Sequence, residues 1–87
     1  MKPARCMGGS RFRIQPDPPQ AGKPLVVTYI GPALVVEYQV DDEPAVRVKP
    51  DANGKFTIDP LPTGDELMLT DNLGQPGYLH ANIAQAP

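Results

Sequence analysis

Apolar and polar residues alternate along most of the chain, with the period of two that a half-buried strand requires. In the segment 34–40, Leu, Val, Tyr and Val occupy every second position, and polar residues such as Glu37 and Gln39 lie between them. The segment 25–30 is instead a continuous run of β-branched, aromatic and aliphatic residues, which is typical of a buried strand. No segment shows the period of about 3.6 residues of an amphipathic helix. The pattern predicts strands at 12–15, 25–30, 34–40, 45–49, 55–59, 66–70 and 78–83.

Turn-forming residues separate these segments. The sequence Asp-Ala-Asn-Gly at 51–54 predicts a hairpin with a type I′ turn, because Asn-Gly accepts positive φ angles. Short strands separated by turns at intervals of about 8–12 residues favour a sandwich or a small barrel. We favour the sandwich, because the inward side chains of two sheets can meet across one thin core. The expected core consists of Leu25, Val27, Tyr29, Val36, Tyr38, Val40, Val48, Phe56, Ile58, Leu67, Leu69, Leu79, Ala81 and Ile83.

Proline and glycine are unusually frequent, at twelve and eight of the 87 residues. Prolines spread from Pro3 to Pro87 exclude a helical bundle, since an interior proline costs a helix about 3 kcal/mol. So much proline and glycine also fits a disordered chain, but the apolar content of 40% and its alternation argue against disorder. Most prolines lie between the predicted strands, where they restrict the unfolded chain without interrupting a strand. The sequence therefore predicts an all-β protein, a single small antiparallel sandwich.

Charge is divided unevenly along the chain. The first 13 residues hold four basic residues and no acid, a charge of +4, whereas residues 14–87 hold four basic and ten acidic residues, a charge of −6. We therefore divide the chain into a basic, irregular N-terminal arm, residues 1–15, and a sandwich, residues 16–87. An acidic body has no general attraction for nucleic acid, so no nucleic-acid partner is expected. The arm can order on an acidic protein partner, although a frayed and solvated terminus is the alternative interpretation.

Few residues could carry out catalysis. Nucleophilic catalysis needs a nucleophile and a base, and a dyad of the single cysteine, Cys6, with the single histidine, His80, is the one enzymatic alternative that we considered. One cysteine and one histidine cannot complete a zinc site, and the lone Cys6 cannot form an internal disulfide. The acidic residues at 41–43 and 51–54 are interpreted as solvated turns rather than calcium ligands. The sequence predicts no enzyme activity, no cofactor and no metal.

The chain shows no segment that would insert into a membrane. No apolar stretch reaches the length of about 20 residues of a membrane helix, and the first residues lack the apolar segment of a signal peptide. We therefore expect synthesis in the cytoplasm if the chain is complete. That expectation does not hold for a domain cut from a longer secreted protein.

Two stretches of the chain resemble a known family. The sequence AGKPLVVTYIG at 21–31 resembles the first strands of Ig-like domains from bacteria and phages, and PTGDELMLTDNLGQPGYLHANI at 62–83 resembles their last strands. The resemblance covers 20–83 and implies an Ig-like sandwich of about seven strands. The chain departs from antibody domains, which carry a cysteine pair and a tryptophan. The segment DANGKFTIDPLPTG at 51–64 resembles transthyretin-like or carboxypeptidase-regulatory modules, which we rank second.

Resemblance to Ig-like domains implies a function in binding. Small domains of this group occur as accessory components of phage particles, so we expect a non-enzymatic structural protein that decorates a capsid or tail, made in the host cytoplasm and located in the virion. The alternative is an Ig-like adhesion or carbohydrate-binding module of a bacterial surface protein, located at the cell surface. The expected partner is a capsid or tail protein assembly, and homo-oligomerisation is left open. The predicted docking residues are Lys2, Arg5, Arg11, Phe12 and Arg13.

Overall fold

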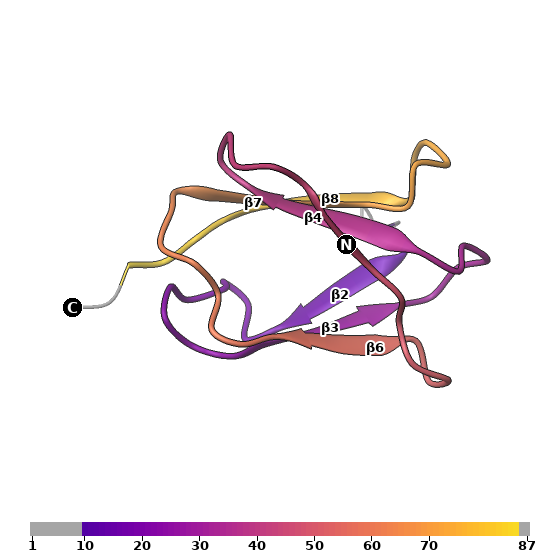
Figure 1. Ribbon diagram of the computed structural model, residues 1–87, viewed down its shortest axis with the longest axis horizontal. Helices are drawn as coiled ribbons and strands as arrows, with labels where there is room; N and C mark the ends of the chain where they lie inside the picture. The colour runs from indigo at the N-terminus through magenta and orange to yellow at the C-terminus, as the bar shows by residue number, and fades with distance from the viewer. Residues whose placement is uncertain (1–9, 86–87) are drawn as a thin grey trace, which may run out of the picture.

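Two antiparallel sheets packed face to face form the fold of residues 10–85, which are the residues that the computed structural model describes (Figure 1). One sheet has the strand order β2-β3-β6 and the other has the order β5-β4-β7-β8. The chain crosses between the sheets after β3, β5 and β6, as in Greek-key sandwiches. This arrangement confirms the predicted class, a small all-β sandwich with seven strands. The strands are β2 (Phe12–Gln15), β3 (Leu25–Tyr29), β4 (Val36–Val40), β5 (Val46–Val48), β6 (Lys55–Ile58), β7 (Glu66–Thr70) and β8 (Tyr78–Asn82).

The core lies between the sheets and follows the predicted alternation. Strand β3 buries Leu25, Val27 and Tyr29, and β7 buries Leu67 and Leu69. Their neighbours in sequence point to the outer faces, because successive side chains of a strand alternate between its two sides. The other buried apolar residues are Phe12, Ala21, Val36, Val40, Ile58, Leu61 and Ile83. The remaining expected core residues are half-buried: Tyr38, Val48, Phe56, Leu79 and Ala81.

Three members of the hydrophobic core cluster are missing from the predicted core: Phe12, Ala21 and Leu61. The loops that carry Ala21 and Leu61 are joined by backbone hydrogen bonds, in which the N–H of Gly22 donates to Leu61 O (2.8 Å) and the N–H of Leu61 donates to Lys23 O (3.0 Å). A two-layer sandwich is open at its ends, so that loop side chains have to cover the core there. Leu61 lies between two prolines, where no periodic pattern marks it as buried.

Strand β4 begins two residues later than predicted, at Val36 instead of Leu34. Leu34 is 78% exposed, because the β3–β4 loop continues through residue 35 before the chain enters the second sheet. Strand β5 is also shorter than predicted and lies at the edge of its sheet. Val46, which the alternation places on the same inward side as Val48, is exposed there. The described residues contain no helix long and apolar enough to cross a membrane.

The turn at 51–54 is not the predicted type I′ turn. Only Gly54 has a positive φ, of 78°, whereas a type I′ turn needs positive φ at both central residues. The N–H of Gly54 donates to Asp51 O (2.9 Å), and Asp51 Oδ1 accepts hydrogen bonds from the N–H groups of Asn53 (2.8 Å) and Lys55 (3.0 Å). The aspartate side chain therefore holds the turn by bonding to the backbone that follows it.

Gly54 also lies against the backbone of β3, so a side chain is poorly tolerated there. A Cβ atom on Gly54 would overlap the carbonyl oxygen of Tyr29, and the positive φ adds strain for any residue with a Cβ atom. We expect Gly54→Ala to lower the free energy of unfolding by about 2–3 kcal/mol, measured by urea denaturation. The matched control is Gly74→Ala, at φ 81° with no atom within 4 Å of the added carbon. Equal losses in the two variants would contradict a role for the overlap.

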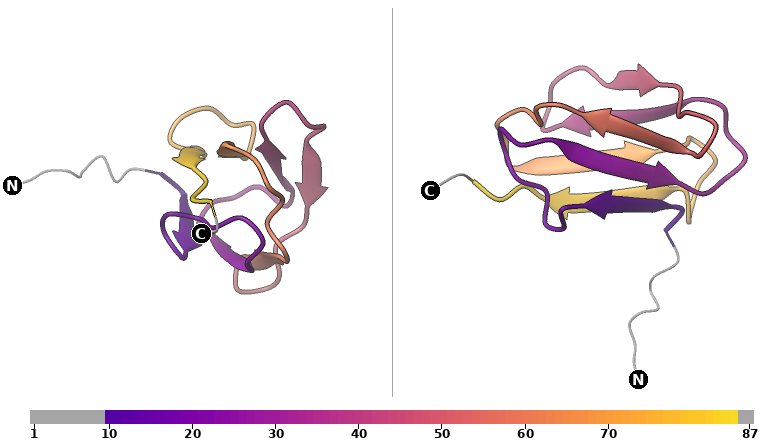
Figure 2. Two further views of the ribbon diagram at one scale, coloured as in Figure 1. Left: turned by 90° about the vertical axis from the view of Figure 1, so that its left-hand side faces the viewer. Right: turned by 90° about the horizontal axis from the view of Figure 1, so that it is seen from below.

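Strand β2 lies beside β8 along one side of the sandwich (Figure 2). At one end of this side, the N–H of Arg11 donates to Pro76 O (2.9 Å) and Ser10 Oγ donates to Tyr78 O (2.9 Å). At the other end, the N–H of Ala21 donates to a carbonyl just beyond β8, that of Ala84 (3.0 Å). These bonds join the two sheets along this side.

Candidate docking surface

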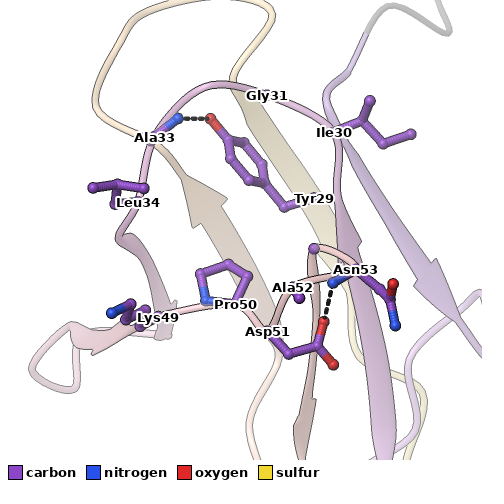
Figure 3. Close-up of a pocket in the computed structure, with 11 residues that line it drawn as sticks. Tyr29, Ile30, Gly31, Ala33, Leu34, Lys49, Pro50, Asp51, Ala52 and Asn53 are labelled. Atoms are coloured by element: carbon purple, nitrogen blue, oxygen red, sulfur yellow. Dashed lines mark hydrogen bonds between the residues drawn. The ribbon is translucent and has the colours of Figure 1, made fainter.

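The β3–β4 loop, residues 30–35, exposes two large apolar side chains. Ile30 is 61% exposed and Leu34 is more exposed still, and Figure 3 shows them pointing to opposite sides of the loop. The loop is held from within by Tyr29, whose hydroxyl accepts a hydrogen bond from the N–H of Ala33 (3.1 Å). A hydrogen-bonded loop thus presents both apolar side chains to solvent.

A shallow hollow of about 370 Å³ lies between this loop and the β5–β6 loop (Figure 3). Ile30 lies on its apolar side, and Lys49 and Asp51 contribute polar groups. The pKa of Asp51 is below its ordinary value, because the backbone N–H groups of Lys55 and Asn53 donate hydrogen bonds to its carboxylate. Asp51 is therefore an ionised group that the turn already uses.

A second hollow, of about 330 Å³, lies on the outer face of the three-stranded sheet and also includes Ile30. Its centre is β3, whose Val26 and Thr28 line the hollow together with Ile30, the first residue after the strand. The strand register places Arg13 of β2 and Lys55 of β6 directly beside Thr28. Ile30 lines both hollows, so we consider the two together. We call this area the Ile30 surface and define it by Arg13, Val26, Thr28, Ile30, Leu34 and Lys55.

A buried carboxylate, Asp71, supports the end of the sandwich that carries this surface. Asp71 is 3% exposed and accepts hydrogen bonds from the Tyr29 hydroxyl (2.7 Å), Arg11 Nη1 (3.1 Å) and the N–H of Leu73 (2.9 Å). Burial raises the pKa of Asp71, but the hydrogen bonds from Tyr29 and Leu73 and the charge of Arg11 outweigh this effect and hold the pKa below its ordinary value. Burial also raises the pKa of Tyr29. At neutral pH the network is therefore an ionised carboxylate with a neutral phenol, and it ties β3 to the chain before β2 and to the β7–β8 loop.

The five predicted docking residues occupy different environments. Lys2 and Arg5 lie outside the described residues. Arg11 forms an ion pair with the buried Asp71, and Phe12 lies in the core. Arg13 is exposed on the Ile30 surface. The structure places β2 within the sandwich, so its residues are not part of an irregular arm.

The burial of Phe12 corrects its assignment to a docking site. Phe12 is 2% exposed, and its ring packs on that of Tyr29 with the centroids 5.0 Å apart. Phe12 was assigned to the arm because it lies next to Arg13, whereas Tyr29, on which its ring packs, is 17 positions away in sequence. The sequence analysis did not predict that Val26 and Ile30 belong to a docking surface. The signal for them is that both are apolar at positions where the usual alternation of a half-buried strand has polar residues.

The residues considered for catalysis do not form a site in the described part of the chain. His80 is exposed on β8, with Nε2 3.5 Å from Glu66 Oε1, and Cys6 lies outside the described residues. Within residues 10–85, no group of three or more His, Cys, Asp or Glu side chains is arranged to hold a metal ion.

No protein-family model, curated protein or solved structure matches this chain. Two arguments for function remain. One is the Ile30 surface, and the other is the prediction, made from the sequence of 20–83, of an Ig-like domain.

Proposed function

We propose that this chain is a non-enzymatic structural protein that docks on a protein assembly through the Ile30 surface. The observation that supports this most is the exposure of Val26 on the outer side of β3 and of Ile30 directly after β3, together with the exposed Leu34 on the same loop as Ile30. Exposed apolar patches with a polar border are typical of protein interfaces. Here Arg13 and Lys55 provide the border.

The assembly that we propose is a phage capsid or tail, which the protein decorates after synthesis in the host cytoplasm. The support for this partner is the resemblance of 20–83 to phage Ig-like domains, which is an analogy at the level of fold. The single cysteine is consistent with it, because a sandwich without an internal disulfide can fold in a reducing cytoplasm. The basic residues Lys2 and Arg5 keep their proposed role in docking.

The test uses phage particles purified from the organism that carries the gene. We expect mass spectrometry to find the chain in these particles at a fixed ratio to a capsid or tail protein. We also expect the purified full chain to rebind to particles that lack it. Absence of the chain from the particles would contradict the proposed partner.

Substitution of the exposed apolar residues tests the proposed surface. We expect Ile30→Ser with Leu34→Ser to reduce occupancy of the particles at least tenfold, because apolar area buried at the centre of an interface carries most of its binding energy. The free energy of unfolding should change by less than about 0.5 kcal/mol, since both side chains are exposed. The control is Leu73→Ser, which removes a leucine that is 55% exposed outside the Ile30 surface. Equal occupancy by all variants would contradict this surface.

A truncation that tests Lys2 and Arg5 has to end before Ser10. A longer deletion, of residues 1–13, also removes Phe12 from the core and Arg11 from Asp71. Loss of binding by that variant would report unfolding as well as loss of the arm. Deletion of residues 1–9 leaves every described residue in place, so we expect it to weaken binding through the lost charges alone.

A further inference from the structure

Arg13, Thr28 and Lys55 form a row across the outer face of the three-stranded sheet. Arg13 is opposite Thr28 in the β2–β3 register, and Thr28 is opposite Lys55 in the β3–β6 register. Directly opposite residues of antiparallel strands have their side chains on the same face. Because neighbouring strands are about 4.8 Å apart, the strand positions of the two cations are about 10 Å apart, with Thr28 between them.

This face has no acidic residue, although the described part of the chain is acidic. That part holds six basic and ten acidic residues, a net charge of −4, yet none of the acids lies on β2, β3 or β6. Within the same part, Arg11 and Arg47 form ion pairs with carboxylates, whereas Arg13 and Lys55 form none. The carboxylate of Asp51, at the turn before β6, is engaged by backbone N–H groups. The two cations are therefore available to a partner.

Apolar side chains flank this row on both sides, one on β3 and one directly after its last residue. Val26 is 38% exposed and Ile30 is 61% exposed, two positions before and two positions after Thr28. Residues two apart in a strand point to the same face and are about 7 Å apart. The Ile30 surface thus has a cationic centre between two apolar positions. The distance from the centre to each apolar position equals the distance between alternate residues of an extended chain.

We infer that the Ile30 surface binds an extended acidic segment of the partner protein, an inference that rests on the proposed function. One Asp or Glu carboxylate of the segment lies between Arg13 and Lys55 and accepts charge-assisted hydrogen bonds from them. The side chains two positions before and after this carboxylate point the same way. They pack on Val26 and Ile30.

A protein segment fits this surface better than a nucleic acid does. Non-specific binding of nucleic acid comes from many cations that contact successive phosphates. The surface has two cations, Arg13 and Lys55, and its remaining width is occupied by Val26 and Ile30. No aromatic side chain lines this hollow to stack with a base.

The test is a titration of the isotope-labelled full chain with an acetylated and amidated peptide of sequence Val-Gly-Glu-Gly-Val, followed by NMR. We expect chemical-shift changes centred on the amides of Arg13, Thr28 and Lys55, and weaker binding at high salt because the contact is partly electrostatic. The same peptide with Gln in place of Glu should bind at least tenfold more weakly. Equal binding of the two peptides, or shift changes spread over all basic residues, would overturn the inference.

Matched charge variants test the residues themselves. We expect Arg13→Gln with Lys55→Gln to weaken peptide binding at least tenfold. The control, Lys23→Gln with Arg47→Gln, changes the net charge equally at exposed residues outside both hollows and should leave binding within about twofold. An equal loss in both variants would show that net charge alone attracts the peptide. A single-stranded oligonucleotide that bound these amides more tightly than the peptide would assign the surface to nucleic acid instead, and would also overturn the inference.

Particle binding separates this inference from the proposed function. Suppose that the variant Ile30→Ser with Leu34→Ser no longer binds the particles, while Arg13→Gln with Lys55→Gln still binds them. The proposed docking surface is then supported, and the inference of an acidic segment is wrong. If the chain is absent from particles but binds the peptide as expected, the phage assembly is wrong and the recognition chemistry stands.

Discussion

We expect Phe12→Ala to lower the free energy of unfolding by about 3–5 kcal/mol. Phe12 is buried in the core and its ring packs on Tyr29, so its removal leaves a cavity between the sheets. A loss of this size is a large part of the stability of about 5–15 kcal/mol that a folded domain has, and it is larger in proportion for a small one. Urea denaturation of the wild type and the variant measures the difference.

The matched control for this loss is the next residue in β2. Arg13 is exposed, so we expect Arg13→Ala to change the free energy of unfolding by less than about 0.5 kcal/mol. An unfolding midpoint of Phe12→Ala equal to that of the wild type would contradict the position of Phe12 in the core. It would also restore the interpretation of β2 as part of an arm.

We expect Asp71→Asn to lower the free energy of unfolding by about 2–3 kcal/mol at neutral pH. The variant keeps the shape of the side chain but loses the charge that Arg11 and the hydroxyl of Tyr29 face. Hydrogen bonds to charged groups contribute more than neutral ones do. The control is Asp42→Asn on the exposed β4–β5 turn, for which we expect little change.

The loss in Asp71→Asn should depend on pH. Because the pKa of Asp71 is lower in the folded protein than in the unfolded chain, its charge stabilises the fold above the ordinary aspartate pKa of about 4. The stabilisation is lost as the pH falls through the lower pKa of the folded state. The difference between wild type and Asp71→Asn is therefore largest at neutral pH and shrinks in acid. A difference that stays constant down to about pH 2 would contradict a role for the charge.

The strands could be predicted from the sequence because alternation is a local property. Strands β2 and β7 have the predicted bounds, and β3 and β8 differ from them by one residue. The errors occur where local pattern and surroundings disagree. Leu34 continues the alternation of β4 but belongs to a loop. Val46 has the predicted alternation but is exposed, because β5 is an edge strand that pairs with β4 alone. Leu61 is buried by the meeting of two loops.

The candidate surface was less accessible to prediction than the fold. Of the Ile30 surface, the sequence indicated Arg13, which is grouped with other basic residues near the N-terminus. The position of Lys55 beside Thr28 follows from the β3–β6 register, which pairs strands from distant parts of the chain. The network around Asp71 joins residues 42 and 60 positions apart, so no short motif could mark it.

Asp51 also covers one end of an edge strand. Its N–H donates to Lys55 O (3.0 Å) and its carboxylate accepts the N–H of Lys55 (3.0 Å), so both backbone groups of the first residue of β6 are engaged. Unpaired backbone groups on an edge strand are a template for pairing with another molecule, and β6 is an edge strand of four residues. Capping its first residue shortens the stretch that a neighbouring copy could extend into a shared sheet.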